Sequence, residues 1–337
     1  MTKARLFILV AATSMVFLGL TGCGSDGDSS RLSVQLSWIK NAEFAGEYFA
    51  DTNGYYAEAG FGSVDLIAGP ADTAAVVLSG NALVGLSDVV ATAEAISKGS
   101  PLKIIGATYQ KNPFSILSLK TRANIRSPQD MIGKRIGVQP GDNEALFDAF
   151  LRANNIAASR VAKVTVGYDP TPLVNGEVDG FLAFITNESI TVQNLGYEVT
   201  NMLFADNGLP FVAEAFVVAA DSIDNERATL KRFLRATIRG WKDALADPDE
   251  GARLAVEVYG ADLGLDIVKE KQQSAAQNEL LIVSDETSAN GLFTISPALQ
   301  ARNIVSLQTA GYDITAAQLF DLSLLEEVYA DNPELRE

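Results

Sequence analysis

Aromatic, amide and carboxylate side chains recur in this sequence where predicted strands end. The positions with these side chains are Trp38, Asn41, Phe44, Asp88, Tyr109, Asn187 and Glu188. Rings offer faces for stacking, and amides and carboxylates accept hydrogen bonds from N–H groups. Lys and Arg are scarce among them, whereas a site for sulfonate, nitrate or phosphate should show cationic side chains or bare backbone N–H donors. The set therefore predicts a binding site for a small, flat, nitrogen-bearing ring.

The three aromatic members are expected to stack on that ring. Trp38 ends the first predicted strand, Phe44 lies in the helix that follows it, and Tyr109 ends the fourth strand. A structural role is the alternative. Trp38 could be a core residue at a strand end, and Phe44 with Tyr48, one helical turn apart, could form the buried face of the first helix.

The polar members are expected to hold the ring from two sides. Asn41 and Asp88 would hydrogen-bond it from the first half of the chain, and Asn187 with Glu188 would hold a ring N–H from the second. Asp88 could instead serve only as the N-cap of its helix. Glu188 closely follows the apolar run GFLAF, where a buried carboxylate needs a partner.

The composition excludes several classes of function. The chain has 337 residues, a formal net charge of -16, no histidine, and Cys23 as its one cysteine. Such a charge is hostile to nucleic acid, and the missing histidine removes the commonest general base and transition-metal ligand. We expect no cofactor, no metal site and no enzymatic activity. An exported enzyme that uses a carboxylate pair, Asp142 with Glu144 or Asp206 with Glu188, is the rival interpretation.

The N-terminus predicts export and lipid anchoring. Two cations precede a nearly uncharged run, residues 6–20, that leads into the tetrad Leu-Thr-Gly-Cys. This pattern is typical of a signal peptide, here residues 1–22, and the tetrad resembles a bacterial lipobox in which Cys23 is acylated. Residues 23–30 form a small, polar tether. We expect the protein in the cell envelope, on the outer face of the cytoplasmic membrane or in the periplasm, although an ordinary signal with a chance cysteine is the alternative.

Hydrophobic periodicity alternates between strand and helix from residue 31 onward. Strands are predicted at 32–38, 64–67, 83–86, 102–109, 136–138, 161–166 and 180–184. Strands that alternate with helices indicate α/β lobes, each with a mostly parallel sheet flanked by helices. Segments 111–120 and 214–221 are predicted to cross between two lobes. Lobe 1 would comprise residues 31–117 and 218–337, with a helical C-terminal part, and lobe 2 residues 118–217.

The motif W-x-x-N-x-x-F-A-G-x-Y, which begins at Trp38, is followed by GLSD, DMIGKRIGV, GEVDGF and TNE. Over residues 31 to about 240 the chain resembles the SsuA/THI5-like (thiamine pyrimidine synthase-like, NMT1-type) branch of periplasmic binding proteins. The resemblance implies a two-lobed periplasmic-binding-protein fold of type II. It also implies a monomer that captures a solute for the permease of an ABC importer.

The ligands of this branch are the aminopyrimidine precursor of thiamine, riboflavin and, in more distant members, sulfonates or nitrate. Its eukaryotic-type synthases consume a histidine of their own, at the position of Phe44 here, and carry a cysteine-rich iron site. Because this chain has neither, the resemblance excludes that reaction. We therefore predict a lipid-anchored receptor that clamps an aminopyrimidine or a flavin between its lobes, with an alkyl sulfonate or nitrate-like anion as the alternative ligand.

Overall fold

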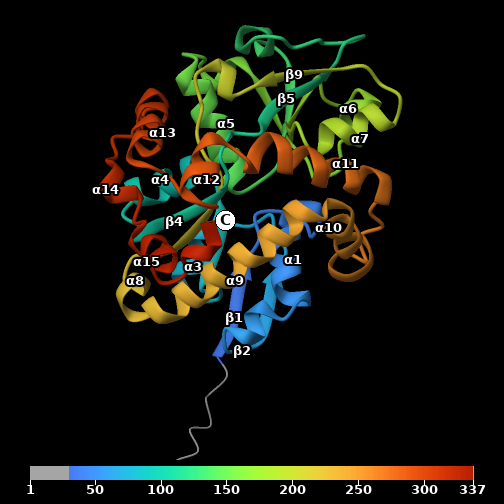
Figure 1. The fold of residues 1–337 in the computed structure, drawn as a ribbon. Coiled ribbons are helices and arrows are strands. Elements are labelled where there is room, and N and C mark those ends of the chain that lie inside the picture. The colour runs from blue at the N-terminus through green and yellow to red at the C-terminus, as the bar shows by residue number, and fades with distance from the viewer. Residues whose placement is uncertain (1–29, 337) are drawn as a thin grey trace, which may run out of the picture.

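The computed structural model describes residues 30–336, which form two lobes, each built on a five-stranded sheet (Figure 1). The first sheet has the strand order β2-β1-β3-β10-β4 and the second β7-β6-β8-β5-β9. The strands of the first sheet are β1 (Ser30–Gln35), β2 (Phe61–Ile67), β3 (Val84–Ser87), β4 (Leu102–Tyr109) and β10 (Ala213–Ala219). Those of the second are β5 (Phe114–Leu119), β6 (Arg135–Val138), β7 (Ala162–Thr165), β8 (Gly180–Phe184) and β9 (Val199–Leu203). The predicted signal peptide, Cys23 and nearly all of the tether lie outside the described residues.

One strand of each sheet runs against the others. β10 pairs antiparallel with β3 and β4, and β5 pairs antiparallel with β8 and β9. These two strands follow the connections between the lobes, residues 110–113 on the way out and 204–212 on the way back. The expected lobe boundaries at 117/118 and 217/218 lie inside β5 and β10. Each of these apolar strands pairs within its sheet as one unit. The chain therefore crosses between the lobes in the loops that precede β5 and β10.

Helices flank both sheets. The first lobe has α1 (Ala45–Thr52), α2 (Tyr55–Glu58), α3 (Thr73–Leu78) and α4 (Val89–Ser97), and the second has α5 (Asp142–Ala153), α6 (Thr171–Asn175) and α7 (Glu188–Asn194). Asp72 caps α3, as its position before the apolar run predicts, because its carboxylate accepts a hydrogen bond from the Ala75 N–H. This cap fixes the residue at which α3 begins.

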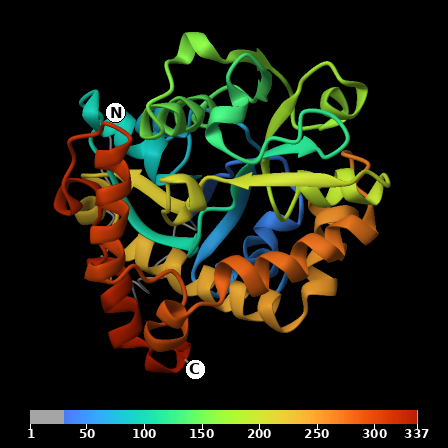
Figure 2. The same cartoon turned by 90° about the horizontal axis from the view of Figure 1, so that it is seen from above.

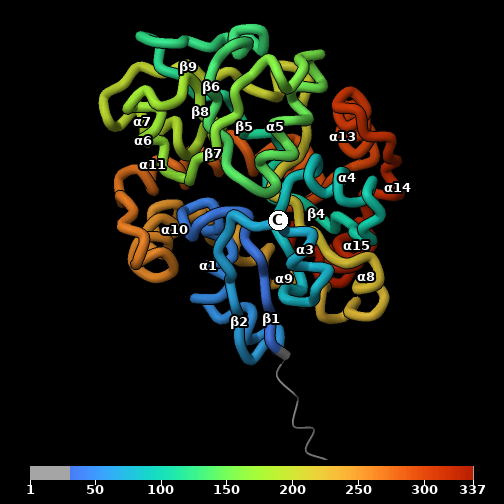
Figure 3. Tube along the Cα trace, turned by 180° about the vertical axis from the view of Figure 1, so that it is seen from behind, coloured from blue at the N-terminus to red at the C-terminus, as the bar shows by residue number. Residues whose placement is uncertain are grey.

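The C-terminal third is helical, as expected, and contacts both lobes (Figures 2 and 3). Its helices are α8 (Ser222–Asn225), α9 (Arg227–Ala246), α10 (Pro248–Leu254), α11 (Ile267–Gln277), α12 (Asp285–Asn290), α13 (Pro297–Thr309), α14 (Ala316–Leu319) and α15 (Ser323–Asp331). α11 packs on α10 and also on α7 of the second lobe, while α13 and α14 pack on α4. Nowhere in residues 30–336 does a helix have the length and apolar content needed to cross a membrane.

Two glycines allow α1 and α9 to pack with their backbones in contact. A Cβ on Gly240 would lie 2.1 Å from the carbonyl oxygen of Gly46, and a Cβ on Gly46 would lie 2.2 Å from the Trp241 ring. Both distances are far below any normal contact. Gly46 belongs to the helix that follows Trp38, so this close packing fixes how the first strand end meets the helical layer.

We predict that Gly240→Ala destabilises the protein by about 1–3 kcal/mol, since the added methyl group must push α1 away from α9. Urea unfolding followed by circular dichroism measures the change. Gly167→Ala is the matched control, because a Cβ there meets nothing within 4 Å. Equal stability of the two variants would contradict the close helix packing.

Candidate functional site

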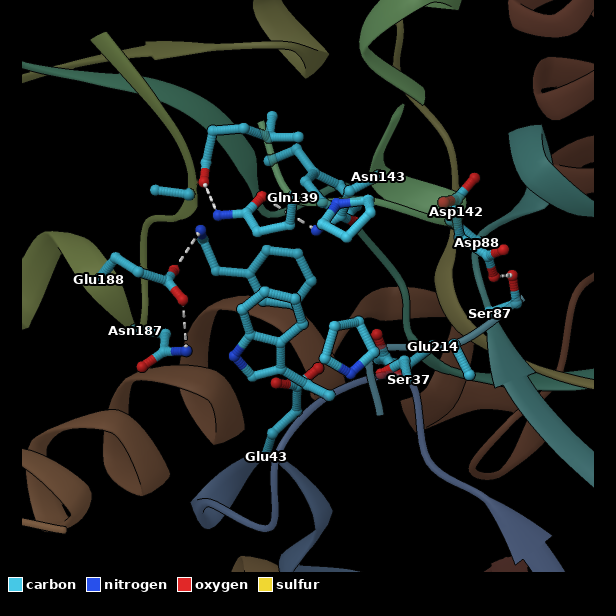
Figure 4. A pocket seen from close by; sticks show the side chains of 18 residues that line it. Ser37, Glu43, Ser87, Asp88, Gln139, Asp142, Asn143, Asn187, Glu188 and Glu214 are labelled. Atoms are coloured by element: carbon cyan, nitrogen blue, oxygen red, sulfur yellow. Dashed lines mark hydrogen bonds between the residues drawn. The ribbon is translucent and has the colours of Figure 1, made fainter. Parts of the chain in front are cut away.

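A slot lies between the lobes, where strand ends of both sheets meet (Figure 4). Residues from both lobes line it: Ser37, Trp38, Glu43, Pro70, Ala71, Ser87, Asp88, Phe114, Gln139, Pro140, Asp142, Asn143, Leu182, Ala183, Phe184, Asn187, Glu188 and Glu214. Its free space, the open mouth and adjoining solvent included, is about 550 Å³. Ligands of α/β proteins bind beyond the carboxyl ends of parallel strands, and this slot has that position.

The aromatic wall contains one predicted stacking residue and two residues that sequence reasoning left out of the site. Trp38 lies in the wall with 8% of its surface exposed. Phe114 and Phe184 also line the slot and meet edge to face, with ring centroids 4.5 Å apart. Phe44 and Tyr109 are fully buried and are not among the lining residues. The Tyr109 hydroxyl donates to Gln277 Oε1 at 2.8 Å, which places that ring in the core behind the wall.

Asn41 lies next to the slot. It is buried and lines an adjoining groove that shares Trp38, Asn187 and Glu188 with the slot. Its Oδ1 accepts from the Glu43 N–H at 3.0 Å and so caps the short 3-10 helix Ala42–Phe44, while its Nδ2 has no partner. The structure thus brings Trp38, Asp88, Asn187 and Glu188 together in the slot, with Asn41 beside it.

Five carboxyl groups line the slot, and none of its lining residues is Lys or Arg. The five are Glu43, Asp88, Asp142, Glu188 and Glu214. Burial raises the pKa of Asp88 and of Glu188 to about 7 and that of Asp142 to about 6. Removal of water penalises the charged form of each group. The slot therefore holds acids that titrate near neutral pH.

The carboxyl groups of Glu43 and Glu214 both line the slot, and each affects the pKa of the other. Burial raises the pKa of Glu214 to about 7 and that of Glu43 well above its usual range. The repulsion between the two acids adds to the rise at Glu43. Two buried carboxyl groups in such proximity favour a state in which one of them stays protonated.

The protein supplies donors to most of these acids. Asp88 caps α4, its Oδ1 accepting from the N–H groups of Val90 at 2.7 Å and Ala91 at 2.9 Å. Asp88 therefore both caps α4 and lines the slot. Glu188 accepts from the Phe184 N–H and from Asn187 Nδ2, both at 2.9 Å.

Serine hydroxyls satisfy two further acids of the slot. Ser87 Oγ donates to Asp142 Oδ2 at 2.5 Å, and Ser37 Oγ donates to Glu214 Oε2 at 2.7 Å. Ser87 is the last residue of β3 in the first sheet and Asp142 begins α5 of the second lobe, so their hydrogen bond joins the lobes.

Helix α11 makes a second connection between the lobes. Lys269 Nζ donates to Asn187 Oδ1 and also to Glu270 Oε1, the latter at 2.9 Å. Glu270 Oε2 accepts from the Ala42 N–H at 2.8 Å. The loop ahead of α7 is thus tied to the residues that follow Trp38.

Sequence reasoning missed Glu214 as a site residue. It lies inside the apolar strand β10 and its backbone has φ of +47°, which is rare for a side chain of this type. A carboxylate within an apolar strand was the available signal, because a buried charge needs a partner. The acid–base pairs proposed for a rival enzyme do not form: Glu144 pairs with Lys163 at the surface and Asp206 is exposed.

The family model described as NMT1/THI5 like matches residues 41–251. The riboflavin-binding protein RibY of Chloroflexus aurantiacus is 29% identical over 74% of this chain and 74% of its own length. The 4-amino-5-hydroxymethyl-2-methylpyrimidine phosphate synthase of Legionella pneumophila is 28% identical over 67% of this chain and 72% of its own length. The crystal structure of the nitrate-binding protein NrtA from Synechocystis PCC 6803 covers 92% of this chain and 91% of its own, with 12% identity and a TM-score of 0.67.

The match to the solved structure shows a shared fold, and it confirms the expected two-lobed periplasmic-binding-protein architecture. The family model confirms the resemblance drawn from the motifs. The sequence led us to expect no enzymatic activity. That expectation is wrong, because a relative at nearly the same identity as RibY is named as a synthase. Missing histidine removes one general base, but buried acids such as Asp88 and Glu188, whose pKa burial raises to about 7, leave acid–base chemistry available.

We predict that the protein loses at least about 2 kcal/mol of stability between pH 5 and pH 8. The folded state keeps protons on acids such as Asp88, whose pKa rises from 3.8 to about 7, while the unfolded chain has released them. Stability is therefore fully present below the unfolded pKa and is lost as pH rises toward the folded pKa. Urea unfolding at a series of pH values measures the slope.

Asp88→Asn should flatten that slope, since Asn caps a helix but has no proton to keep. Asp266→Asn is the control, because Asp266 is an exposed N-cap, of α11. A wild-type stability that stays level or rises from pH 5 to pH 8 would contradict the raised pKa values.

Proposed function

Because this chain belongs to the NMT1/THI5-like family, we propose that it is the solute-binding component of an ABC importer. It captures a small planar nitrogen heterocycle, of the aminopyrimidine or flavin type, in the slot between its lobes and delivers it to a permease. Acylated Cys23 anchors it at the outer face of the cytoplasmic membrane or in the periplasm. The observation that carries this proposal is a slot between two lobes, walled by aromatic rings and acids.

The chemistry of the walls supports a heterocyclic ligand. Trp38 and Phe184 offer ring faces, and the carboxylates accept hydrogen bonds from ring and exocyclic N–H groups. RibY is named for riboflavin and the Legionella enzyme for an aminopyrimidine, and both compounds are planar nitrogen heterocycles. An alkyl sulfonate or nitrate is disfavoured, because it would lie among five acids without a Lys or Arg in the lining.

Capture follows from movement of the lobes. The Ser87–Asp142 hydrogen bond and the Lys269–Asn187 hydrogen bond both join the two lobes, so they form only when the lobes are closed. A ligand that touches both walls binds the closed state better than the open one and shifts the population toward it. Opening breaks these few polar contacts and releases the ligand to the permease.

A carried-over ligand gives the direct test. Residues 24–337 are expressed, and the purified protein is inspected for flavin absorbance and then denatured for mass spectrometry of the released molecules. We expect a planar nitrogen heterocycle at close to one molecule per chain. If the protein is isolated empty, riboflavin and 4-amino-5-hydroxymethyl-2-methylpyrimidine are the probes for calorimetric titration.

For the ligand so identified, we predict that Trp38→Ala and Glu188→Gln each weaken binding at least about tenfold, because stacking and a charge-assisted hydrogen bond each contribute about 1.4 kcal/mol or more. Isothermal titration measures the affinity. Tyr197→Ala, at a ring that is 38% exposed away from the slot lining, is the control and should bind as the wild type does. Affinities of both slot variants within twofold of the wild type would refute the site.

A further inference from the structure

One fully buried oxygen among the acids of the slot has no hydrogen-bond partner. Glu43 is 2% exposed, its carboxyl group points toward the slot in Figure 4, and its Oε1 has no hydrogen-bond partner. Asp88, Asp142, Glu188 and Glu214 each have at least one donor from the protein. A buried acceptor without a donor is costly, so Glu43 Oε1 marks where a ligand donor belongs.

The groups that face Glu43 are mostly acidic. Glu214 of β10 and Glu188 of α7 oppose its ionisation, and Lys269 of α11 favours it to a smaller extent. Burial raises the pKa of two tyrosines behind Glu43, Tyr48 of α1 and Tyr109 of β4, and the charge of Glu43 adds to the rise in both. The surroundings of the pair therefore lack the positive charge that two ionised carboxylates would need.

Resting on the proposed function, we propose that the slot binds its heterocycle as a cation, held at the unpartnered Glu43 Oε1 beside Glu214. One positive charge enters and one proton leaves the Glu43–Glu214 pair for solvent, so the charge of the slot is unchanged. The displaced proton is the one that keeps the empty pair from carrying two negative charges. With the cation in place, the carboxylates of Glu43 and Glu214 are both ionised, and the positive charge of the ligand pairs with them.

A protonated aminopyrimidine fits this arrangement. It carries a ring N–H and an exocyclic amino group, and charged N–H donors of this kind form strong hydrogen bonds with carboxylate oxygens. Glu43 Oε1 takes one donor, and an oxygen of another acid in the slot takes a second. A flavin ring is not protonated near neutral pH, so this inference selects the aminopyrimidine type from the two ligand types left open above.

The test uses matched probes that differ in charge. Benzamidine is a planar cation, benzamide its neutral counterpart and benzoate its anionic counterpart. At pH 7 we expect benzamidine to bind at least tenfold more tightly than benzamide, and benzoate not to bind. Titration calorimetry in phosphate and in Tris, whose heats of ionisation differ, should show release of about one proton per benzamidine bound.

Glu43→Gln keeps the size of the side chain but removes its charge. We expect this variant to lose at least tenfold in benzamidine affinity and most of the proton release, while its benzamide affinity stays within twofold. Glu257→Gln, at an exposed acid that pairs with Arg253 on the surface, is the matched control and should behave as the wild type. A fold-intact Glu43→Gln variant that binds benzamidine as tightly as the wild type overturns the proposal.

Other outcomes separate this inference from the proposed function. If riboflavin binds in a manner that depends on Trp38 while benzamidine does not bind, the cation inference fails and the solute-binding role stands. If no probe of any charge binds, both fail. Calcium chloride serves as a metal-ion probe. If calcium and benzamidine bind with the same affinity and lose affinity equally in Glu43→Gln, the inference that the slot takes an organic cation is also overturned.

Discussion

Burial of five carboxyl groups where two sheets meet is the constraint on which this site depends. A buried charge is tolerated only when it is paired, hydrogen-bonded or neutralised by a proton. The scaffold uses the last two means: helix N–H groups hold Asp88, a backbone N–H and an amide hold Glu188, and a raised pKa lets Glu43 keep its proton beside Glu214. Glu43 Oε1, a fully buried oxygen of these acids without a hydrogen-bond partner, is the position that the scaffold leaves to a ligand.

The topology explains why acids from distant parts of the chain can meet. Parallel strands bring their carboxyl ends to one edge, and the two sheets turn these edges toward each other across the slot. The chain passes between the lobes at the connections 110–113 and 204–212, which precede β5 and β10. Helix α11 joins the lobes as well, because Lys269 reaches the second lobe and Glu270 the first.

Local pattern was sufficient for much of the fold. β4 and β8 have the bounds that their apolar runs predict, and Asp72 caps the helix expected to begin after it. Hydrophobic periodicity and helix capping depend on residues that are close together in the chain, so a single sequence is enough to predict them. β9, with the residues VTNML, was not predicted because it shows no clean alternation, and its strand conformation comes from pairing with β5.

The site was predictable only in part, because a residue's place at a strand end does not say which way its side chain points. Trp38 and Asp88 reach the slot, whereas Tyr109, at the end of β4, turns into the core toward Gln277. Phe44 was assigned to stacking, but the helix it precedes buries it completely. Glu214 depends on a neighbour 171 residues earlier in the chain, Glu43, and no local pattern contains such a pair. The same pair shows why composition excluded too much: without histidine the chain still holds a transferable proton, because two acids forced together out of water retain one.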